Sequence, residues 1–293
     1  MTAALDLAGL DRAVEAAFSS RDERALHVLG YGEISTVLAW PEPDGPFACK
    51  RLPTFDDADR FDAYRAVFHT SIETLAARGL VVHPTSLDGL HRSDGTVAAY
   101  CVQRVLPTAS MAPERLREAD PPAGRALLDR IAETVGTVVD QRVGLDAQLS
   151  NWAEVDGELV YLDVTTPLLR GKGGTDLLDT ELFLASIPAA VRPLVRKLVL
   201  PSILDTYFAA RPIALDLVGN LHKEHLGAWV PTAIDVFNGR FDLELTDAEV
   251  RHYYRRDARL WEWTQRARRL DRGWQRHVRR RPYRLLLPGP VER

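Results

Sequence analysis

The stretch DAQLSNWAEVDGELVYLD, residues 146–163, decides the fold. Two short apolar runs joined at Asp156-Gly157 predict a β-hairpin in its middle. Asp146 and Asn151 stand five residues apart before the hairpin, and Asp163 follows it. Such hard oxygen ligands favour magnesium, which bridges phosphate oxygens, and Asp146 suits the orientation or deprotonation of an attacking hydroxyl. The alternative is that each residue has a common local role of its own, with Asp146 capping a helix, Asn151 in a turn and Asp163 at the end of a strand.

A glycine-containing turn joins two predicted strands near the N-terminus, in Gly30-Tyr31-Gly32-Glu33-Ile34-Ser35-Thr36-Val37. Glycines allow the backbone of a turn to approach phosphate groups and to present N–H donors to them. An ordinary hairpin turn explains the glycines equally well. A strand rather than a helix follows the turn, which argues against a dinucleotide-binding fingerprint.

A lysine and a glutamate occupy the next two predicted elements. Lys50 lies thirteen residues after Val37, on a short strand whose alternation places it on the opposite face from Cys49. Glu73 lies on a helix predicted for residues 56–78. An ammonium group held by a carboxylate from a helix is suited to pair with nucleotide phosphates. A solvated strand lysine and an exposed helix glutamate are the alternatives.

The order of elements agrees with these motifs. Strands, one of them expected over residues 80–84, surround a single helix up to about residue 106. Beyond Pro107 the chain is mostly helical except for the hairpin, with a helix expected over residues 112–142. This order, with its glycine turn, strand lysine, helix glutamate, Asp-x-x-x-x-Asn and post-hairpin Asp, resembles the protein-kinase superfamily over residues 26–167. It is closest in character to aminoglycoside-phosphotransferase-like small-molecule kinases.

The resemblance implies a fold and a set of roles. The fold would be α+β and bilobal, with an N-terminal lobe of residues 1–106 built from a small antiparallel sheet and one helix, and a larger helical C-terminal lobe of residues 107–293. ATP and Mg²⁺ would be the cofactors. Asp146 would be the catalytic base, acting with Lys50, and Asn151 and Asp163 would hold the metal. The residues expected to bind the nucleotide are Gly30, Gly32, Ser35, Lys50, Glu73, Gln103 and Val105.

Several departures from the family pattern bear on which kind of kinase the chain resembles. Ser35 replaces the third loop glycine, and Gly144-Leu145 replaces His-Arg before the catalytic Asp. The Gly after the metal Asp is missing, because Asp163 is followed by Val164-Thr165-Thr166-Pro167, and no Ala-Pro-Glu follows. These losses argue against a regulated protein kinase. We expect an ATP- and magnesium-dependent phosphotransferase acting on a hydroxyl of a small molecule. The alternative is a nucleotide-binding pseudokinase that serves as a scaffold without turnover.

Charge is unevenly distributed along the chain. From Arg251 to Arg284 there are 13 Arg against three acids, a local charge of +10 that leaves −14 elsewhere at a net charge of −4. One interpretation is a helix that packs its apolar stripe (Leu260, Trp263, Ala267, Leu270, Trp274 and Val278) and exposes a basic face. The other is a surface for an anionic partner. No nucleic-acid-binding motif accompanies the stretch, which argues against nucleic acid as that partner.

Targeting signals are not evident. No run approaches the roughly 18 apolar residues of a membrane span. The N-terminal segment carries acids early, whereas a signal peptide has basic residues before an unbroken apolar run. We therefore expect a cytoplasmic protein without a membrane span.

Overall fold

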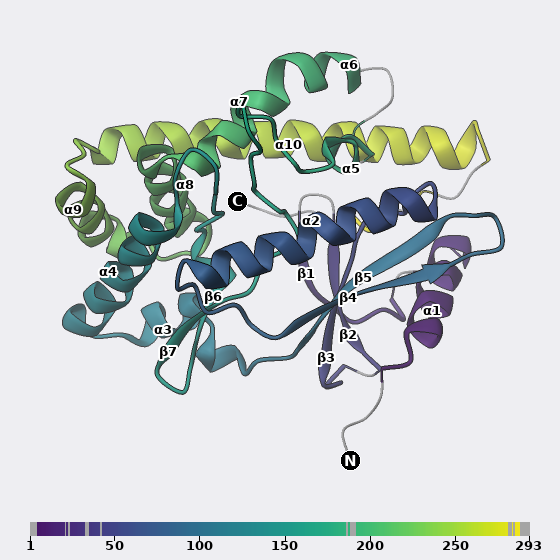
Figure 1. The fold of residues 1–293 in the computed structure, drawn as a ribbon, viewed down its shortest axis with the longest axis horizontal. Coiled ribbons are helices and arrows are strands. Elements are labelled where there is room, and N and C mark those ends of the chain that lie inside the picture. The colour runs from purple at the N-terminus through teal and green to yellow at the C-terminus, as the bar shows by residue number, and fades with distance from the viewer. Residues whose placement is uncertain are drawn as a thin grey trace.

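The computed structural model describes residues 5–20, 22, 24–32, 35–41, 43–185, 187, 192–280, 283 and 285–287. A five-stranded antiparallel sheet has the order β1-β2-β3-β5-β4, with strands β1 (Val28–Tyr31), β2 (Thr36–Trp40), β3 (Phe47–Arg51), β4 (Thr85–His91) and β5 (Val97–Arg104). Helix α2 (Ala58–Ala77) connects β3 to β4 and crosses in front of the sheet in Figure 1. The rest is mostly helical, so the predicted α+β fold class, a small antiparallel sheet followed by a larger helical part, is confirmed.

The sheet separates two apolar clusters. On one face, helix α1 (Leu7–Ser20) packs Leu10 and Val14 in a cluster with Cys49 and Tyr100. On the other face, α2 packs its aromatic side chains in a cluster that includes Leu52, Phe55, Ala99 and Cys101. Lys50 lies on the face opposite Cys49, as the strand pattern predicted, and this is the α2 side, because Lys50 is paired with Cys101 of the second cluster. Burial raises the pKa of the Cys49 and Cys101 thiols to about 12, so both behave as small apolar groups.

The helical part follows β5. Its longer elements are α3 (Ala112–Glu118), α4 (Pro121–Val138), α8 (Ala210–Lys223), α9 (Val230–Phe241) and α10 (Asp247–His277). Shorter helical segments are α5 (Thr180–Ala185), α6 (Arg192–Leu194), α7 (Leu200–Asp205), η1 (Thr108–Ser110), η2 (Leu149–Asn151), η3 (Val195–Val199), η4 (Thr206–Phe208) and η5 (Gly227–Trp229). The hairpin strands are β6 (Trp152–Val155) and β7 (Glu158–Tyr161), and they form a separate two-stranded sheet.

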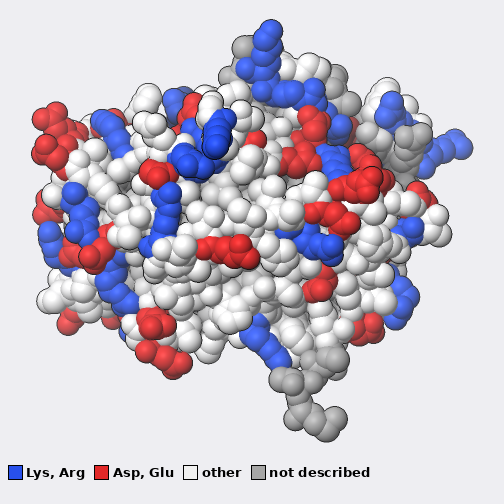
Figure 2. Space-filling model, viewed as in Figure 1, with Lys and Arg blue, Asp and Glu red and all other residues white. Residues whose placement is uncertain are grey.

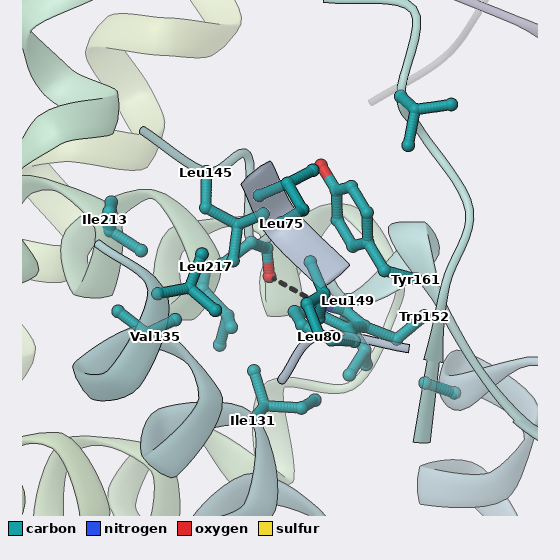
Figure 3. Packing of buried hydrophobic residues seen from close by; sticks show 14 of the residues in the cluster. Leu75, Leu80, Ile131, Val135, Leu145, Leu149, Trp152, Tyr161, Ile213 and Leu217 are labelled. Atoms are coloured by element: carbon teal, nitrogen blue, oxygen red, sulfur yellow. Dashed lines mark hydrogen bonds between the residues drawn. The ribbon is translucent and has the colours of Figure 1, made fainter. Parts of the chain in front are cut away.

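One core joins the sheet side to the helical part. Figure 3 shows Leu75 and Leu80, from the end of α2 and the residues after it, beside Leu145, Leu149 and Tyr161 of the hairpin region. The same cluster continues into α4 and α8. The position of the hairpin relative to α2 is therefore determined by apolar packing.

Two predicted elements differ from the structure. The helix expected over residues 112–142 is split, because Asp120 caps a new helix by accepting a hydrogen bond from Ala123 N at 2.9 Å. The strand expected at residues 80–84 is replaced by a single bridge from Val82 to Tyr161, and β4 begins after Pro84, which has no N–H to donate. The hairpin is confirmed, with its turn at Asp156 and Gly157, both at positive φ.

Helix α10 differs most from expectation. The interpretation that its apolar stripe packs against the rest of the protein is wrong, since Trp263 is 58% exposed and Leu270 is 76% exposed. The residues of α10 that are buried are Val250, Gln265 and Arg268. The other interpretation, a surface for an anionic partner, stays a prediction. Arg281 and Arg284 of the basic stretch lie outside the described residues. Within the described ranges, no helix is long and apolar enough to cross a bilayer.

Candidate active site

The centre of the site is an ion pair between β3 and the residues that follow β7. Lys50 Nζ lies 2.7 Å from each of the two carboxylate oxygens of Asp163, although the residues are 113 positions apart. Both side chains are partly buried. Burial raises the pKa of Asp163, but the charge of Lys50 and hydrogen bonds from Lys50 and Thr165 outweigh it, and the net pKa lies below the ordinary value. Asp163 is therefore held as a carboxylate.

The glycine turn lies beside Lys50 of this pair. Gly32 N donates to Ser35 O at 2.9 Å, and Ser35 is buried. A Cβ added at Gly32 would lie 2.7 Å from Ser35 Oγ and 4.0 Å from Lys50 Cε, so the backbone of the turn closely approaches the lysine. Space is open around Gly30. Glu33 and Ile34, which stand between Gly32 and Ser35 in the sequence, lie outside the described residues.

The loop that carries Asp146 is tied to the hairpin by its backbone carbonyls. Asn151 Nδ2 and the Tyr161 hydroxyl both donate to Asp146 O at 3.1 Å. Leu162 N donates to Asn151 O at 2.9 Å. These bonds hold Asp146 and Asn151 next to the end of β7, two residues before Asp163.

Gln103 and Val105 differ in their surroundings. The Gln103 amide donates to Leu162 O at 2.8 Å and to Thr85 Oγ1 at 2.9 Å, so this side chain braces the residue before Asp163. Val105 N donates to Pro46 O at 3.0 Å, and its side chain is exposed. Nucleotide contacts for both residues remain a prediction.

The structure does not bring Glu73 to Lys50. The buried positions of α2 are Phe61, Tyr64, Phe68, Ser71 and Leu75. Glu73 follows Ser71 by two residues, which rotates it to the opposite, exposed side of the helix. The carboxylate that holds Lys50 is that of Asp163, and this corrects the expected Lys50–Glu73 pair.

Two residues missed by sequence reasoning support Asp163 from behind. Thr165 donates its backbone N–H at 3.1 Å and its hydroxyl at 2.7 Å to Asp163 Oδ1. The Tyr64 hydroxyl donates to Thr165 O at 2.9 Å, and burial raises the pKa of Tyr64 well above its ordinary value, which keeps it a donor. A threonine two positions after an aspartate is a local signal for such a turn. The Tyr64 contact has no local signal.

A third missed residue, Asp216 of α8, lies behind the loop that carries Asp146. It is a hydrogen-bond partner of Gln148 and accepts from the Tyr253 hydroxyl of α10 at 2.8 Å. Burial raises the pKa of Asp216, and the hydrogen bonds from Tyr253 and Gln148 oppose that rise. This network connects α8 and α10 to the loop that carries Asp146.

The oxygen ligands at the site suit magnesium. Within the described part of the chain, no group of three or more His, Cys, Asp or Glu side chains is suited to hold a metal ion. Asp163 and Asn151 supply two hard oxygen ligands at most, and magnesium commonly binds through one or two carboxylates together with substrate phosphates and water. The residues therefore fit a metal that arrives with a nucleotide rather than one held by protein alone.

The pH dependence of stability tests the Lys50–Asp163 pair. Since the folded pKa of Asp163 is lowered, its carboxylate stabilises the fold above its unfolded pKa of about 3.9, and this contribution is lost as the pH falls toward the folded pKa. We expect Asp163→Asn to flatten the dependence of the free energy of unfolding on pH between about 5 and 2. Urea denaturation across this range measures it. Asp156→Asn, in the exposed hairpin turn, should leave the slope unchanged.

Two comparisons with known proteins match most of the length of the chain. No curated protein matches the chain. The solved structures that match include one described as "WaaP in complex with acyl carrier protein", with 16% sequence identity and a TM-score of 0.39 over 89% of this chain and 95% of that chain. The family model described as "Family of unknown function (DUF6206)" matches residues 9–272. The chain therefore belongs to the DUF6206 family.

Proposed function

We propose that the protein is an ATP- and magnesium-dependent phosphotransferase that acts on a hydroxyl group of a small molecule. The observation that carries the proposal is the Lys50–Asp163 pair, whose lysine lies beside the Gly32–Ser35 turn. A fixed ammonium, a carboxylate and a close-approaching glycine backbone are the groups that phosphoryl transfer requires. These groups come together from three distant segments. A hairpin turn, a solvated strand lysine and a strand-end aspartate, each with its own local role, would not explain why they meet.

Each residue has a distinct task in this proposal. The backbone at Gly30, Gly32 and Ser35 covers the phosphates, and Lys50 exchanges part of its contact with Asp163 for a phosphate oxygen. Asp163 and Asn151 hold magnesium, which when bound neutralises phosphate charge. Asp146 orients the acceptor hydroxyl and takes its proton as the new oxygen–phosphorus bond forms and the bond to ADP breaks.

A second candidate, nucleotide binding without turnover, is favoured by one observation. Asp163 Oδ1 already accepts hydrogen bonds from Lys50, Thr165 N and Thr165 Oγ1, and Glu73 is not available to take Lys50 away. A scaffold would bind nucleotide in this arrangement and would not complete the magnesium site. The two candidates differ in whether magnesium strengthens nucleotide binding.

A thermal-shift titration with ATP, with and without magnesium, tests the proposal. A ligand present at 100 times its Kd should add about 2.7 kcal/mol to the free energy of unfolding. We expect Lys50→Ala to lose this stabilisation and Glu73→Ala to keep it, since Glu73 is exposed and does not contact Lys50. Stabilisation indifferent to magnesium would favour the scaffold. Stabilisation that survives Lys50→Ala would place nucleotide elsewhere.

A further inference from the structure

Helix α10 carries a row of exposed large apolar side chains. Eleven large apolar residues are exposed among those described, and five of them belong to α10 or its C-cap: Leu260 (48%), Trp263 (58%), Leu270 (76%), Trp274 (56%) and Val278 (57%). At 100° per residue these positions fall on one side of the helix. Contiguous exposed apolar surface of this kind marks an interaction site.

The exposed row is not needed to hold α10 in place. The helix packs on α8 and α9 through its first half, where Val250 is fully buried. Further along, the residues that face the protein are polar, with Gln265 and Arg268 both buried. Tyr283, which follows the helix, has charged α10 residues including Arg268 and Arg272 around it. The apolar side of the helix is thus the side turned to solvent.

Exposed arginines accompany the row. Arg256, Arg259 and Arg266 are exposed, and the helical periodicity places them on the same side as Trp263. The stretch from Arg251 to Arg284 carries a charge of +10, whereas the rest of the chain carries −14. Over the face that Figure 2 shows, acidic and basic side chains are intermixed, with no single extended patch of one sign. Charge complementarity therefore points to an anionic partner at this helix.

The aliphatic members of the row identify the class of partner. Aromatic side chains and arginines suit stacked bases and phosphates, but Leu260, Leu270 and Val278 would stay in water on a nucleic acid. A second copy of the same face would bring arginines against arginines, which is unfavourable. A lipid surface accepts all three groups, because aliphatic side chains enter the acyl boundary, Trp prefers the interface and Arg contacts anionic headgroups.

The shape of the helix suits a flat partner. With 31 residues and a rise of 1.5 Å per residue, α10 is about 46 Å long. In Figure 1 it runs along the upper part of the molecule over most of its width. The row from Leu260 to Val278 extends along roughly 27 Å of this length. A straight row of this length matches a planar surface better than a globular pocket.

We propose that α10 docks the protein on the surface of an anionic membrane, lying in the interface with the Leu260–Val278 row toward the lipid. The proposal does not depend on the phosphotransferase activity. It requires no membrane span, since a helix of this kind lies in the plane of the headgroups.

Vesicle flotation of the full chain tests the proposal. We expect the protein to float with vesicles of phosphatidylcholine and phosphatidylglycerol, and to float less with phosphatidylcholine alone or at high salt. Leu270→Glu should lower the partition coefficient at least about tenfold, since a factor of ten corresponds to about 1.4 kcal/mol, less than the burial of one leucine contributes. Leu29→Glu, at a 51% exposed leucine of β1, is the matched control and should bind as the wild type does.

Further variants and measurements distinguish a membrane from the other possible binding partners of α10. Arg259→Glu should weaken binding to the anionic vesicles only, and thermal unfolding would show that each variant folds. Should Leu270→Glu fail to fold, Trp263→Ala takes its place, with the same expected direction. Equal flotation of Leu270→Glu and wild type would overturn the proposal. So would binding to an oligonucleotide without vesicle binding, or a dimer in light scattering that Leu270→Glu dissociates without any flotation of the wild type.

Discussion

Asp163→Asn should lower the rate of phosphoryl transfer by on the order of 10³-fold or more and remove the magnesium-dependent part of stabilisation by ATP. The asparagine oxygen still accepts from Thr165 and lies near Lys50, so the local fold should persist. What is lost is the negative charge that attracts a divalent cation. The rate is measured as transfer of the labelled γ-phosphate of ATP to water and to a panel of small hydroxyl compounds.

A control in the same hairpin region isolates the effect. Asp156 occupies the exposed turn between β6 and β7 with a φ of 51°, a conformation that asparagine adopts readily. Asp156→Asn removes the same charge from the same segment and should leave both turnover and the magnesium effect intact. Full turnover in Asp163→Asn would exclude Asp163 as the metal ligand. Unmeasurable turnover in the wild type, with nucleotide binding intact, would leave the scaffold as the function.

The fold was predictable where the determining signals are local. Alternation along β3 placed Lys50 and Cys49 on opposite faces, and the structure confirms this, since Cys49 packs in the cluster with α1 whereas Lys50 is paired across the sheet with Cys101 of the other cluster. The Asp156-Gly157 dipeptide located the hairpin, because few residues adopt positive φ there. The five-residue spacing from Asp146 to Asn151 placed both residues on one loop, and in the structure the Asn151 side chain and the Tyr161 hydroxyl hold that loop by donating to Asp146 O.

The rest of the site depends on contacts between distant segments. The Lys50–Asp163 pair spans 113 positions, and the Tyr64–Thr165 bond spans 101. Neither contact produces a recurring pattern in the sequence from which it could be predicted. Glu73 shows why sequence spacing alone is insufficient. It stands at the expected distance along the chain, but the buried side of α2 contains Tyr64 and Phe68, so Glu73 points away from Lys50. Rotation of a helix is decided by packing, which sequence spacing alone does not contain.

Helix α10 shows the same limit on a larger scale. Its stripe at helical spacing indicated an amphipathic helix, and the helix is present over Asp247–His277. Periodicity does not say which side the protein covers. Here the polar side of the helix packs through Gln265 and Arg268, and Tyr253 reaches Asp216 behind the loop that carries Asp146. The same helix thus connects the loop of Asp146 to the surface that we propose docks on lipid.

Asp146→Asn should reduce turnover by about 10²–10⁴-fold while leaving nucleotide binding unchanged. The amide cannot take a proton from the acceptor hydroxyl, whereas the bonds that hold the loop use the backbone carbonyl of Asp146 and are kept. Single-turnover transfer from labelled ATP measures the rate, and a thermal shift with ATP and magnesium measures binding.

The matched control for Asp146 is Asp140→Asn. Asp140 lies before the same loop, pairs with Arg78 at an exposed position and caps Arg142 N and Val143 N through Oδ1, an acceptor that asparagine retains. It should keep full turnover. A loss of turnover in both variants would mean that the loop responds to charge removal as a whole. A loss confined to Asp146→Asn, with stabilisation by ATP intact, would distinguish a proton acceptor from a residue that binds nucleotide. Equal turnover in Asp146→Asn and wild type would remove Asp146 from the chemistry, while Lys50 and Asp163 would still define the nucleotide site.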